Sequence, residues 1–313
     1  MSQNNPSIIY AGLDIHKATL QLHLTGRDCE LPNTPAGHRK LLALLSKHST
    51  SHVICEASGG YERPIVAALH AAGHPVSVLN PTQARHFARA LGQRAKTDPL
   101  DARLLSLCGE ALRPAPTPPR SQEQRQLVEL VRYRQQLMEK LLAERQQAEM
   151  IEFPSLRRQS LSLARRMESD LAKVDALLSQ LRNASCELAA KAQQLTSVVG
   201  VGDQTALSLL AEMPELGTLN RRQAAALAGL APHPRQSGQW VGKSSIGGGR
   251  PQIRRALYMA ALCASRLHPT LSIFYKRLRD TGKPPKVALT AVMRKLLVLL
   301  NLTLKNSLFP LAS

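Results

Sequence analysis

The sequence SIIYAGLD, residues 7–14, is an apolar run that ends in an aspartate. Residues 19–24 follow with apolar and polar side chains in alternation, which is typical of a strand with one buried face. Together the two runs predict a hairpin that opens a β-sheet. Two more short apolar runs, His52–Cys55 and Pro75–Leu79, predict further strands. Residues with helical spacing lie between and after these runs, at 37–47, 60–72, 81–91 and 98–112. Alternating strands and helices predict an α/β domain.

The chain of 313 residues is long enough for more than one domain, and the proline-rich stretch PAPTPPRS, residues 114–121, predicts a boundary. Beyond it, residues 122–151 contain no glycine or proline and have leucines at helical spacing. A second such segment extends from about Leu156 to Gln194. We therefore expect an α/β domain over residues 1–113, a long helical (coiled-coil) hairpin over 120–194, and a helical domain over 195–313.

Positive charge is concentrated at the C-terminal end of the sequence. Lys and Arg number 41 against 22 Asp and Glu, a net charge of +19. Residues 235–313 hold 14 basic side chains and a single acidic one, Asp280, and so carry +13 of that total. A basic block of this size is the electrostatic footprint expected of a protein that binds a polyanion such as nucleic acid.

The cysteine pattern and the apolar runs bear on the compartment. The five cysteines are scattered, without a CxxC pair or a Cys–His cluster, which favours a reducing compartment and argues against structural zinc. The first residues lack the layout of a signal peptide. The longest apolar run, Val287 to Leu304, is interrupted by Arg294 and Lys295, and we expect it not to span a membrane. The sequence predicts a cytoplasmic protein with no membrane partner.

Four carboxylates occur where a metal site would need them. Asp14 and Glu56 each end an apolar strand, at the edge of an open α/β sheet where ligands bind. In KTDPLDA, residues 96–102, Asp98 and Asp101 are three residues apart and share one helix face. Four neighbouring carboxylates repel one another unless cations neutralise them, so the set predicts two Mg²⁺ ions for phosphoryl transfer.

The stretch KTDPLDA has a second interpretation that leaves no role for metal. Asp98 would be the N-cap of a helix, Pro99 its first residue and Asp101 a capping-box acid. From this stretch alone the two interpretations are equally good.

GLDIHK around Asp14, together with Glu56 and KTDPLDA, resembles the RuvC-like, RNase H-fold nuclease domain of the DEDD insertion-sequence transposases. These enzymes are the bridge-RNA-guided recombinases, and the similarity extends over nearly the whole chain. The resemblance implies Mg²⁺-dependent transposition of DNA by site-specific recombination. It also implies that Asp14, Glu56, Asp98 and Asp101 are the catalytic metal ligands.

The C-terminal region has features that suit nucleic acid. Residues 195–213 contain a VGVG turn between apolar helical segments, the layout of a helix-hairpin-helix, in which Gly200 and Gly202 could offer backbone N–H groups to phosphate. A glycine-hinged helix pair in an ordinary bundle explains the pattern equally well. Trp240 could stack on a base or pack in a core. The candidate cations for nucleic-acid contacts are Lys96, Arg235, Lys243, Arg250, Arg254 and Arg255.

Three serines in this region, Ser237, Ser244 and Ser245, are candidate nucleophiles, although composition alone makes each a loop serine. In the family that the chain resembles, the nucleophile lies in a Q-S-G segment after G-L-x-P, which here is Ser237. The resemblance implies a covalent phosphoserine intermediate and a homo-oligomer in which Ser237 reaches the carboxylates of another protomer. It further implies a structured non-coding guide RNA that pairs with target and donor DNA.

One segment departs from the commoner family pattern. IGGGRPQIRRALYMAA, residues 246–261, replaces an I-S-K-R-G-N type segment and resembles a glycine-rich subgroup. The serine assignment is unaffected, but the family's detailed nucleic-acid contacts do not carry over. Two other functions stay open on the residues alone. One is a metal-dependent, junction-resolving nuclease that uses water, and the other is a non-catalytic nucleic-acid-binding protein whose acids are helix caps.

Overall fold

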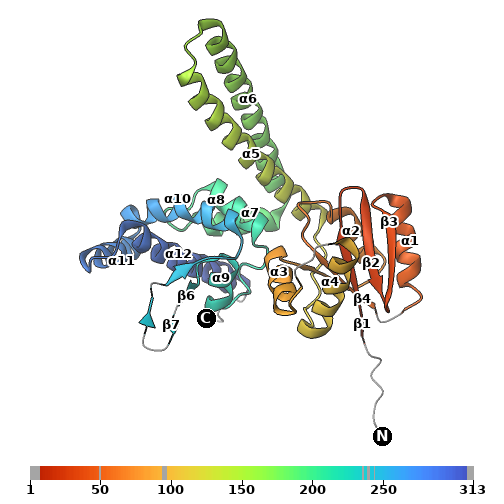
Figure 1. Cartoon of the computed structure of the whole chain (residues 1–313). Coiled ribbons are helices and arrows are strands. Elements are labelled where there is room, and N and C mark those ends of the chain that lie inside the picture. The colour runs from red at the N-terminus through yellow and green to blue at the C-terminus, as the bar shows by residue number, and fades with distance from the viewer. Residues whose placement is uncertain are drawn as a thin grey trace. The chain divides into compact units, whose positions relative to one another are not determined.

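The structure, a computed structural model, describes residues 8–48, 51–93, 97–234, 236–237, 240–242 and 244–308. The chain divides into two compact units, Met1–Arg120 and Ser121–Ser313 (Figure 1). The division falls at the end of the proline-rich stretch, between Arg120 and Ser121.

The first unit is a mixed five-stranded sheet with helices on both faces (Figure 1). Its elements are β1 (Ile9–Ile15), β2 (Thr19–Leu24), β3 (Arg27–Pro32), α1 (Pro35–Leu45), β4 (Ser51–Glu56), α2 (Arg63–Ala71), β5 (Val76–Leu79), α3 (Pro81–Ala90) and α4 (Asp98–Leu112). The strand order is β3-β2-β1-β4-β5. β1 and β2 are antiparallel, as are β2 and β3, whereas β1 and β4, and β4 and β5, are parallel. The predicted α/β fold and its opening hairpin are confirmed.

Strand β3 was not predicted, because its sequence, RDCELP, lacks the apolar alternation that is typical of a strand. It lies at the edge of the sheet, where only Leu31 is buried and Cys29 half-buried. A strand that is mostly exposed can be polar on both faces, so no apolar alternation marks it.

The alternation of side chains along β1 directs each residue to one of two cores. Leu13 packs with Leu41 of α1 and Ile65 of α2 on one face. Tyr10 packs with Leu105 of α4 on the other face. Asp14 is an even number of residues from Tyr10, so it belongs to the face that α4 covers.

Helix α4 lies unusually close to β1, because each element has a glycine at the contact. A Cβ atom on Gly12 would lie 1.8 Å from the carbonyl oxygen of Ala102, and one on Gly109 would lie 2.7 Å from the Tyr10 ring. The Ser106 hydroxyl donates to the Tyr10 carbonyl at 2.7 Å. Tyr10 of β1 contacts Gly109 of α4, whereas Gly12, which is closer to Asp14, contacts Ala102. Residue numbers therefore increase along β1 while they decrease along α4. The helix is therefore antiparallel to β1, and its N-terminus reaches the end of the strand where Asp14 lies.

The second unit is helical, and the segment between two of its helices contains four two-residue strands. Its helices are α5 (Gln122–Met150), α6 (Pro154–Ala184), α7 (Cys186–Thr196), α8 (Asp203–Glu212), α9 (Arg221–Leu227), α10 (Pro251–Leu267), α11 (Pro269–Asp280) and α12 (Pro285–Leu308). Between α9 and α10, β6 (Pro232–His233) pairs with β9 (Ser245–Ile246), and β7 (Gln236–Ser237) pairs with β8 (Trp240–Val241).

Helices α5 and α6 form an antiparallel hairpin (Figure 1). Arg134 and Asp175 bond across it at 2.5 Å, and the Ser160 hydroxyl donates to Glu144 at 2.6 Å. The base of the hairpin is not separate from the rest of the unit, because Leu127 and Leu178 belong to the same core as helices α7 to α12. Where we expected a hairpin and a further domain, one compact unit holds both.

The second long helical segment also ends earlier than the sequence predicted. We expected it to continue to Gln194, but it breaks at Ser185, whose backbone is extended. The Ser185 hydroxyl accepts the N–H of Leu188 and so begins α7 as an N-cap.

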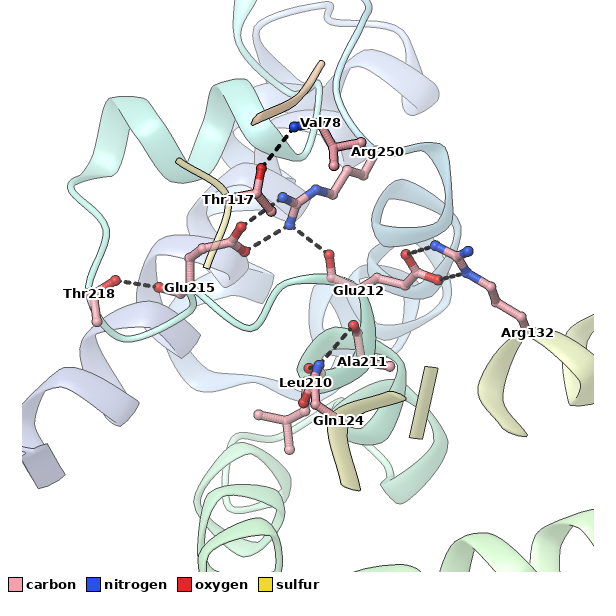
Figure 2. A network of polar contacts seen from close by, with 10 residues as sticks. All are labelled: Val78, Thr117, Gln124, Arg132, Leu210, Ala211, Glu212, Glu215, Thr218 and Arg250. Carbon is pink, nitrogen blue, oxygen red and sulfur yellow. Dashed lines mark hydrogen bonds and ion pairs between the residues drawn. The ribbon is translucent and has the colours of Figure 1, made fainter. Parts of the chain in front are cut away.

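A polar network fixes the loop between α8 and α9 (Figure 2). The Arg250 guanidinium donates to both carboxylate oxygens of Glu215, at 2.7 and 2.8 Å, and to the Glu212 carbonyl at 2.7 Å. The Glu212 carboxylate accepts two bonds from Arg132 of α5. Farther along the loop, buried Asn301 of α12 accepts from the Gly217 N–H and donates to the Leu219 carbonyl. These bonds position α9 and the strands that follow it.

Helix α12 contains the longest apolar run, and residues 285–306 are long and apolar enough by composition to cross a membrane. Half of an 18-residue window in that segment is buried inside the protein. Val292, Leu296 and Leu300 are fully buried and belong to the core of the second unit. Core packing accounts for much of the apolar character of α12.

Replacing Arg250 with alanine is expected to lower the free energy of unfolding by about 2–3 kcal/mol, because it strands the half-buried Glu215 carboxylate and the Glu212 carbonyl. Denaturant unfolding of the full chain measures the loss. The matched control is Arg255→Ala, which removes a more exposed pair with Glu139 and should cost less than about 0.5 kcal/mol. Equal losses in the two variants would contradict a special role for Arg250.

Candidate active site

The central side chain of the candidate site is Asp14, near the end of β1. It is only 6% exposed, and its Oδ1 accepts the N–H of Ile15 at 3.0 Å. Burial raises the pKa of Asp14, and the like charges of Asp101 and Asp98 raise it further. His16 and the Ile15 N–H oppose that rise without cancelling it. A carboxylate held in this environment gains stability from any cation that binds beside it.

Asp98 and Asp101 lie in the first turn of α4, and neither caps it. The N-cap is Thr97, whose carbonyl accepts the N–H of Asp101, and Asp98 is the first helical residue. Asp101 is therefore the fourth helical residue and not at the third position that a capping box requires. This geometry removes the capping interpretation. Both side chains are close enough to Asp14 to affect its pKa.

Glu56 ends β4, the parallel neighbour of β1. The register pairs Gly12 with Ile54 and Leu13 with Cys55, so Asp14 and Glu56 come next on adjacent strands and share one face of the sheet. Glu56 is half-buried. The structure thus brings Asp14, Asp98 and Asp101 together, and it positions Glu56 at the same sheet edge.

The loop after Glu56 is held by a carboxylate that the sequence did not single out. Glu62 accepts the N–H and hydroxyl of Ser58, each at 3.1 Å, and the N–H of Gly60 at 2.8 Å. Burial alone would raise the pKa of Glu62, but these bonds and its own N–H together hold the pKa below its ordinary value. Glu62 therefore fixes the backbone immediately beyond Glu56.

His16 is a further member of the site that sequence reasoning missed. Its Nδ1 is 3.8 Å from Asp14 Oδ2, and its Nε2 is 3.8 Å from Asp98 Oδ1. One ligand atom from each of the three residues lies within 4.8 Å of the others. The only sequence signal was its place in GLDIHK, two residues after Asp14.

Asn33 connects the two loops that flank the site. Its Nδ2 donates to the carbonyl of His16 at 2.8 Å and to that of Tyr61 at 3.4 Å, and its Oδ1 bonds His38 Nε2 at 2.8 Å. Because the Asn33 oxygen is an acceptor, His38 carries its proton on Nε2. Burial lowers the pKa of His38, which favours this neutral form. Nothing in the local sequence signals these long-range contacts.

The donor set fits a divalent cation. Carboxylate oxygens are the ligands that Mg²⁺ prefers, and the imidazole of His16 is a nitrogen ligand that suits transition metals. Asp14, buried with a raised pKa and a second oxygen directed toward His16, is the feature that a bound cation would stabilise most. Asp14, Asp98 and His16 would hold the ion, with Asp101 and Glu56 beside them.

The predicted nucleophile lies in the segment of short strands between α9 and α10 of the second unit. Ser237 is exposed, and its backbone pairs with that of Trp240 in the short β7–β8 hairpin. The side chain of Trp240 lies outside the described residues, as do Lys96, Arg235 and Lys243, so their predicted roles stay predictions.

The predicted phosphate-binding glycines have different surroundings. Gly200 has a φ of +100°, and a Cβ there would lie 2.8 Å from the backbone nitrogen of Ala264 in α10. It is therefore needed for helix packing. Gly202, the N-cap of α8, is exposed and faces open space. The predicted phosphate contacts of both glycines stay predictions.

The three predicted nucleic-acid arginines that the structure describes have partners within the chain. Arg250 binds Glu215, and this carboxylate raises the pKa of the guanidinium. Arg254 donates to the carbonyls of Ala228 and Gly248, and Arg255 pairs with Glu139. Their predicted contacts with nucleic acid stay predictions, while the structure gives Arg250 and Arg254 roles in folding.

Comparisons with known proteins match both units. Residues 11–153 match a family model described as "Transposase", and residues 192–276 match "Transposase IS116/IS110/IS902 family". The chain is 32% identical over 302 residues to the "Pilin gene-inverting protein" of Moraxella bovis and to that of Moraxella lacunata, covering 93% of this chain and 94% of each relative. It is 34% identical over 118 residues to "Insertion element IS110 uncharacterized 43.6 kDa protein" of Streptomyces coelicolor, covering 37% of this chain and 29% of that protein.

Proposed function

The chain belongs to the IS110 family of transposases, which are DNA recombinases, and on that premise we propose that it exchanges DNA strands by metal-assisted serine chemistry. The observation that carries the proposal is the position of Asp14, which is buried at the end of a central strand beside Asp98 and Asp101. Burial and the charges of these two neighbours raise the pKa of Asp14. The relatives named as gene-inverting proteins indicate the overall reaction, a site-specific rearrangement of DNA segments.

We assign the first unit to the RuvC-like RNase H fold and the α5–α6 hairpin to the coiled coils. The strand order β3-β2-β1-β4-β5, with β1 antiparallel to β2 and parallel to β4, supports the first assignment. The Arg134–Asp175 bond between antiparallel helices supports the second.

In the proposed reaction the carboxylates would hold Mg²⁺, with two ions expected, and the bound ions would supply positive charge at the scissile phosphate. Divalent cations in such a site stabilise negative charge on the transferring phosphoryl group and on the leaving oxygen. Asp14 is positioned by the sheet, Asp98 and Asp101 by the first turn of α4, and Glu56 by β4. His16, whose ring nitrogens lie 3.8 Å from Asp14 Oδ2 and Asp98 Oδ1, would be a further ligand beside the two carboxylates.

Ser237 is the proposed nucleophile. The Oγ–phosphorus bond forms as the bond from phosphorus to a deoxyribose oxygen breaks, and the proton lost by the serine hydroxyl ends on that oxygen, which leaves as the hydroxyl of the strand end. The resulting phosphoserine keeps the energy of the broken bond, so the reverse step can rejoin the phosphate to a different strand. The exposure of Ser237 on a short hairpin suits an attack on a large substrate.

The proposed partners are DNA, a structured non-coding guide RNA from the same element, and further copies of the chain. The excess of basic residues after residue 234 supports binding of nucleic acid of either kind. The proposal includes a composite site in which Ser237 reaches the carboxylates of another protomer. A protein that acts on DNA must reach the chromosome. We therefore propose the cytoplasm as the compartment.

The test compares wild type with Ser237→Ala. Each is mixed with Mg²⁺, end-labelled element DNA and RNA transcribed from the element's flank, and then separated on a denaturing protein gel. We expect a labelled protein band in wild type and none in the variant. Cleavage by both proteins without an adduct would establish a nuclease that uses water, and unchanged DNA binding without any cleavage would favour a non-catalytic binding protein.

A further inference from the structure

A large apolar groove crosses the second unit. Its volume is about 890 Å³, and it lies between the β6–β9 strand pair, α9, α11 and α12. The apolar side chains that line it include Ile246, Leu271, Phe274, Val287, Val298 and Leu302. Val287 is 53% and Leu302 is 38% exposed, so one apolar stripe of α12 faces the groove while another is buried in the core. A surface of this kind is typical of a binding site for a partner.

The charged side chains at this groove are all positive. Arg221, Arg294 and Lys295 line it, and among the described lining residues there is no carboxylate. Lys295 lies over the Phe274 ring, with its Nζ 4.0 Å from the centroid. The groove therefore fits an occupant that combines apolar and acidic side chains.

The tip of the α5–α6 hairpin has such side chains. Met150, Phe153 and Leu156 are 86%, 64% and 52% exposed, an unusual amount of apolar surface for one turn of chain. Glu149 and Glu152 flank Met150 and Phe153, and the next charges, Arg157 and Arg158, follow on the first turns of α6. The tip segment, residues 149–156, is thus apolar with two acids and no base.

The tip cannot reach the groove of its own chain. Helix α5 has 29 residues without glycine or proline and therefore extends about 43 Å. Its first turns pack in the core that also holds α12, through Leu127 and Val131. The tip lies at the opposite end of this helix (Figure 1). An occupant from this protein must come from a second copy.

We propose that the hairpin tip of one chain binds the apolar groove of a second copy. Phe153 and Met150 enter the groove, and Glu149 and Glu152 face Arg294 and Lys295. A stable complex buries roughly 1,200 Å² of surface, which favours an arrangement with more than one such contact. A two-fold pair in which each tip fills the other's groove doubles the area and closes the assembly. The proposal does not depend on the chemistry at Asp14 or Ser237.

The test measures the mass of the full chain in solution by sedimentation velocity, without DNA or RNA. We expect wild type to dimerise and Phe153→Asp to weaken the association at least 10-fold, since a buried unpaired charge costs more than 1.4 kcal/mol. The control is Leu142→Asp, on the shaft of the same hairpin and 51% exposed, which should associate like wild type. Far-UV circular dichroism checks that all variants are folded.

Charge reversal distinguishes this contact from any other. Glu152→Arg and Arg294→Glu should each weaken the homodimer. Both interfaces of the Glu152→Arg homodimer then have two facing positive charges, and both interfaces of the Arg294→Glu homodimer have two facing negative charges. A mixture of the two variants should recover association as heterodimers, in which each interface pairs opposite charges. A monomeric wild type, unaffected Phe153→Asp chains or no recovery on mixing would overturn the proposal. If Arg294→Glu instead weakened nucleic-acid binding with the dimer intact, the groove would be a nucleic-acid site.

Discussion

Replacing Asp14 with asparagine is expected to abolish strand cleavage while making the metal-free protein more stable. Loss of one ligand oxygen and its charge removes several kcal/mol of charge stabilisation at the scissile phosphate, which corresponds to roughly 10³-fold or more in rate. The stability gain follows from burial of the same carboxylate, which costs free energy when it is ionised without a cation. Asparagine keeps the acceptor for the Ile15 N–H.

The sign of the pH dependence follows from the raised pKa. The folded state binds the Asp14 proton more tightly than the unfolded state, so stability is greatest below the ordinary aspartate pKa. It falls as the pH rises from that value through the raised pKa and stays lower above it. Asp14→Asn removes this loss. We therefore expect the variant to have the higher melting temperature at pH 7.5 in a chelator, and the difference to shrink as the pH falls.

Thermal unfolding at several pH values, in chelator and in Mg²⁺, measures both effects. Mg²⁺ should raise the melting temperature of wild type much more than that of Asp14→Asn. Glu110→Gln is the control, because Glu110 is an exposed carboxylate farther along α4 and should change neither property. A lower melting temperature for Asp14→Asn in chelator would mean that Asp14 is a structural partner of His16.

The core strands and the position of Asp14 could be predicted because burial leaves a direct trace in the sequence. The run that becomes β1 is apolar because both faces of the strand are covered, and its terminal aspartate is conspicuous for the same reason. The edge strand β3 and the helix break at Ser185 left no such trace. A mostly exposed strand has no apolar pattern, and serine interrupts a helix only where its hydroxyl finds an N–H to cap.

The remaining parts of the site depend on contacts between residues far apart in sequence. His16 joins the carboxylates because α4 brings Asp98 to the end of β1, and Asn33 bridges two loops because β2 and β3 fold back beside them. The count of basic residues predicts a polyanion-binding region but could not show that Arg250 is paired with Glu215. Local patterns reveal burial, whereas pairing is decided by the fold.

Gly12→Ala is expected to disturb the site without altering a single ligand. The new methyl group would lie 1.8 Å from the Ala102 carbonyl and 2.6 Å from the Ser106 nitrogen, both backbone atoms of α4. Because backbone cannot rotate away, the helix must move off β1, and Asp98 and Asp101 move with it. We expect a loss of about 3 kcal/mol in the free energy of unfolding and a decrease of roughly 100-fold in cleavage rate.

The matched variant is Gly109→Ala, at the far end of the same contact. Its methyl group would meet side-chain atoms of Ile54 and Tyr10 at 2.6 and 2.7 Å, and side chains can adjust more easily than backbone. Gly109→Ala should therefore destabilise the unit by about 1–2 kcal/mol and leave the carboxylates near Asp14. The decisive measurement is the Mg²⁺-induced rise in melting temperature, which should be retained in Gly109→Ala and lost in Gly12→Ala. If both variants kept it, the close packing of α4 on β1 would serve stability alone, and the carboxylates would tolerate a displaced helix.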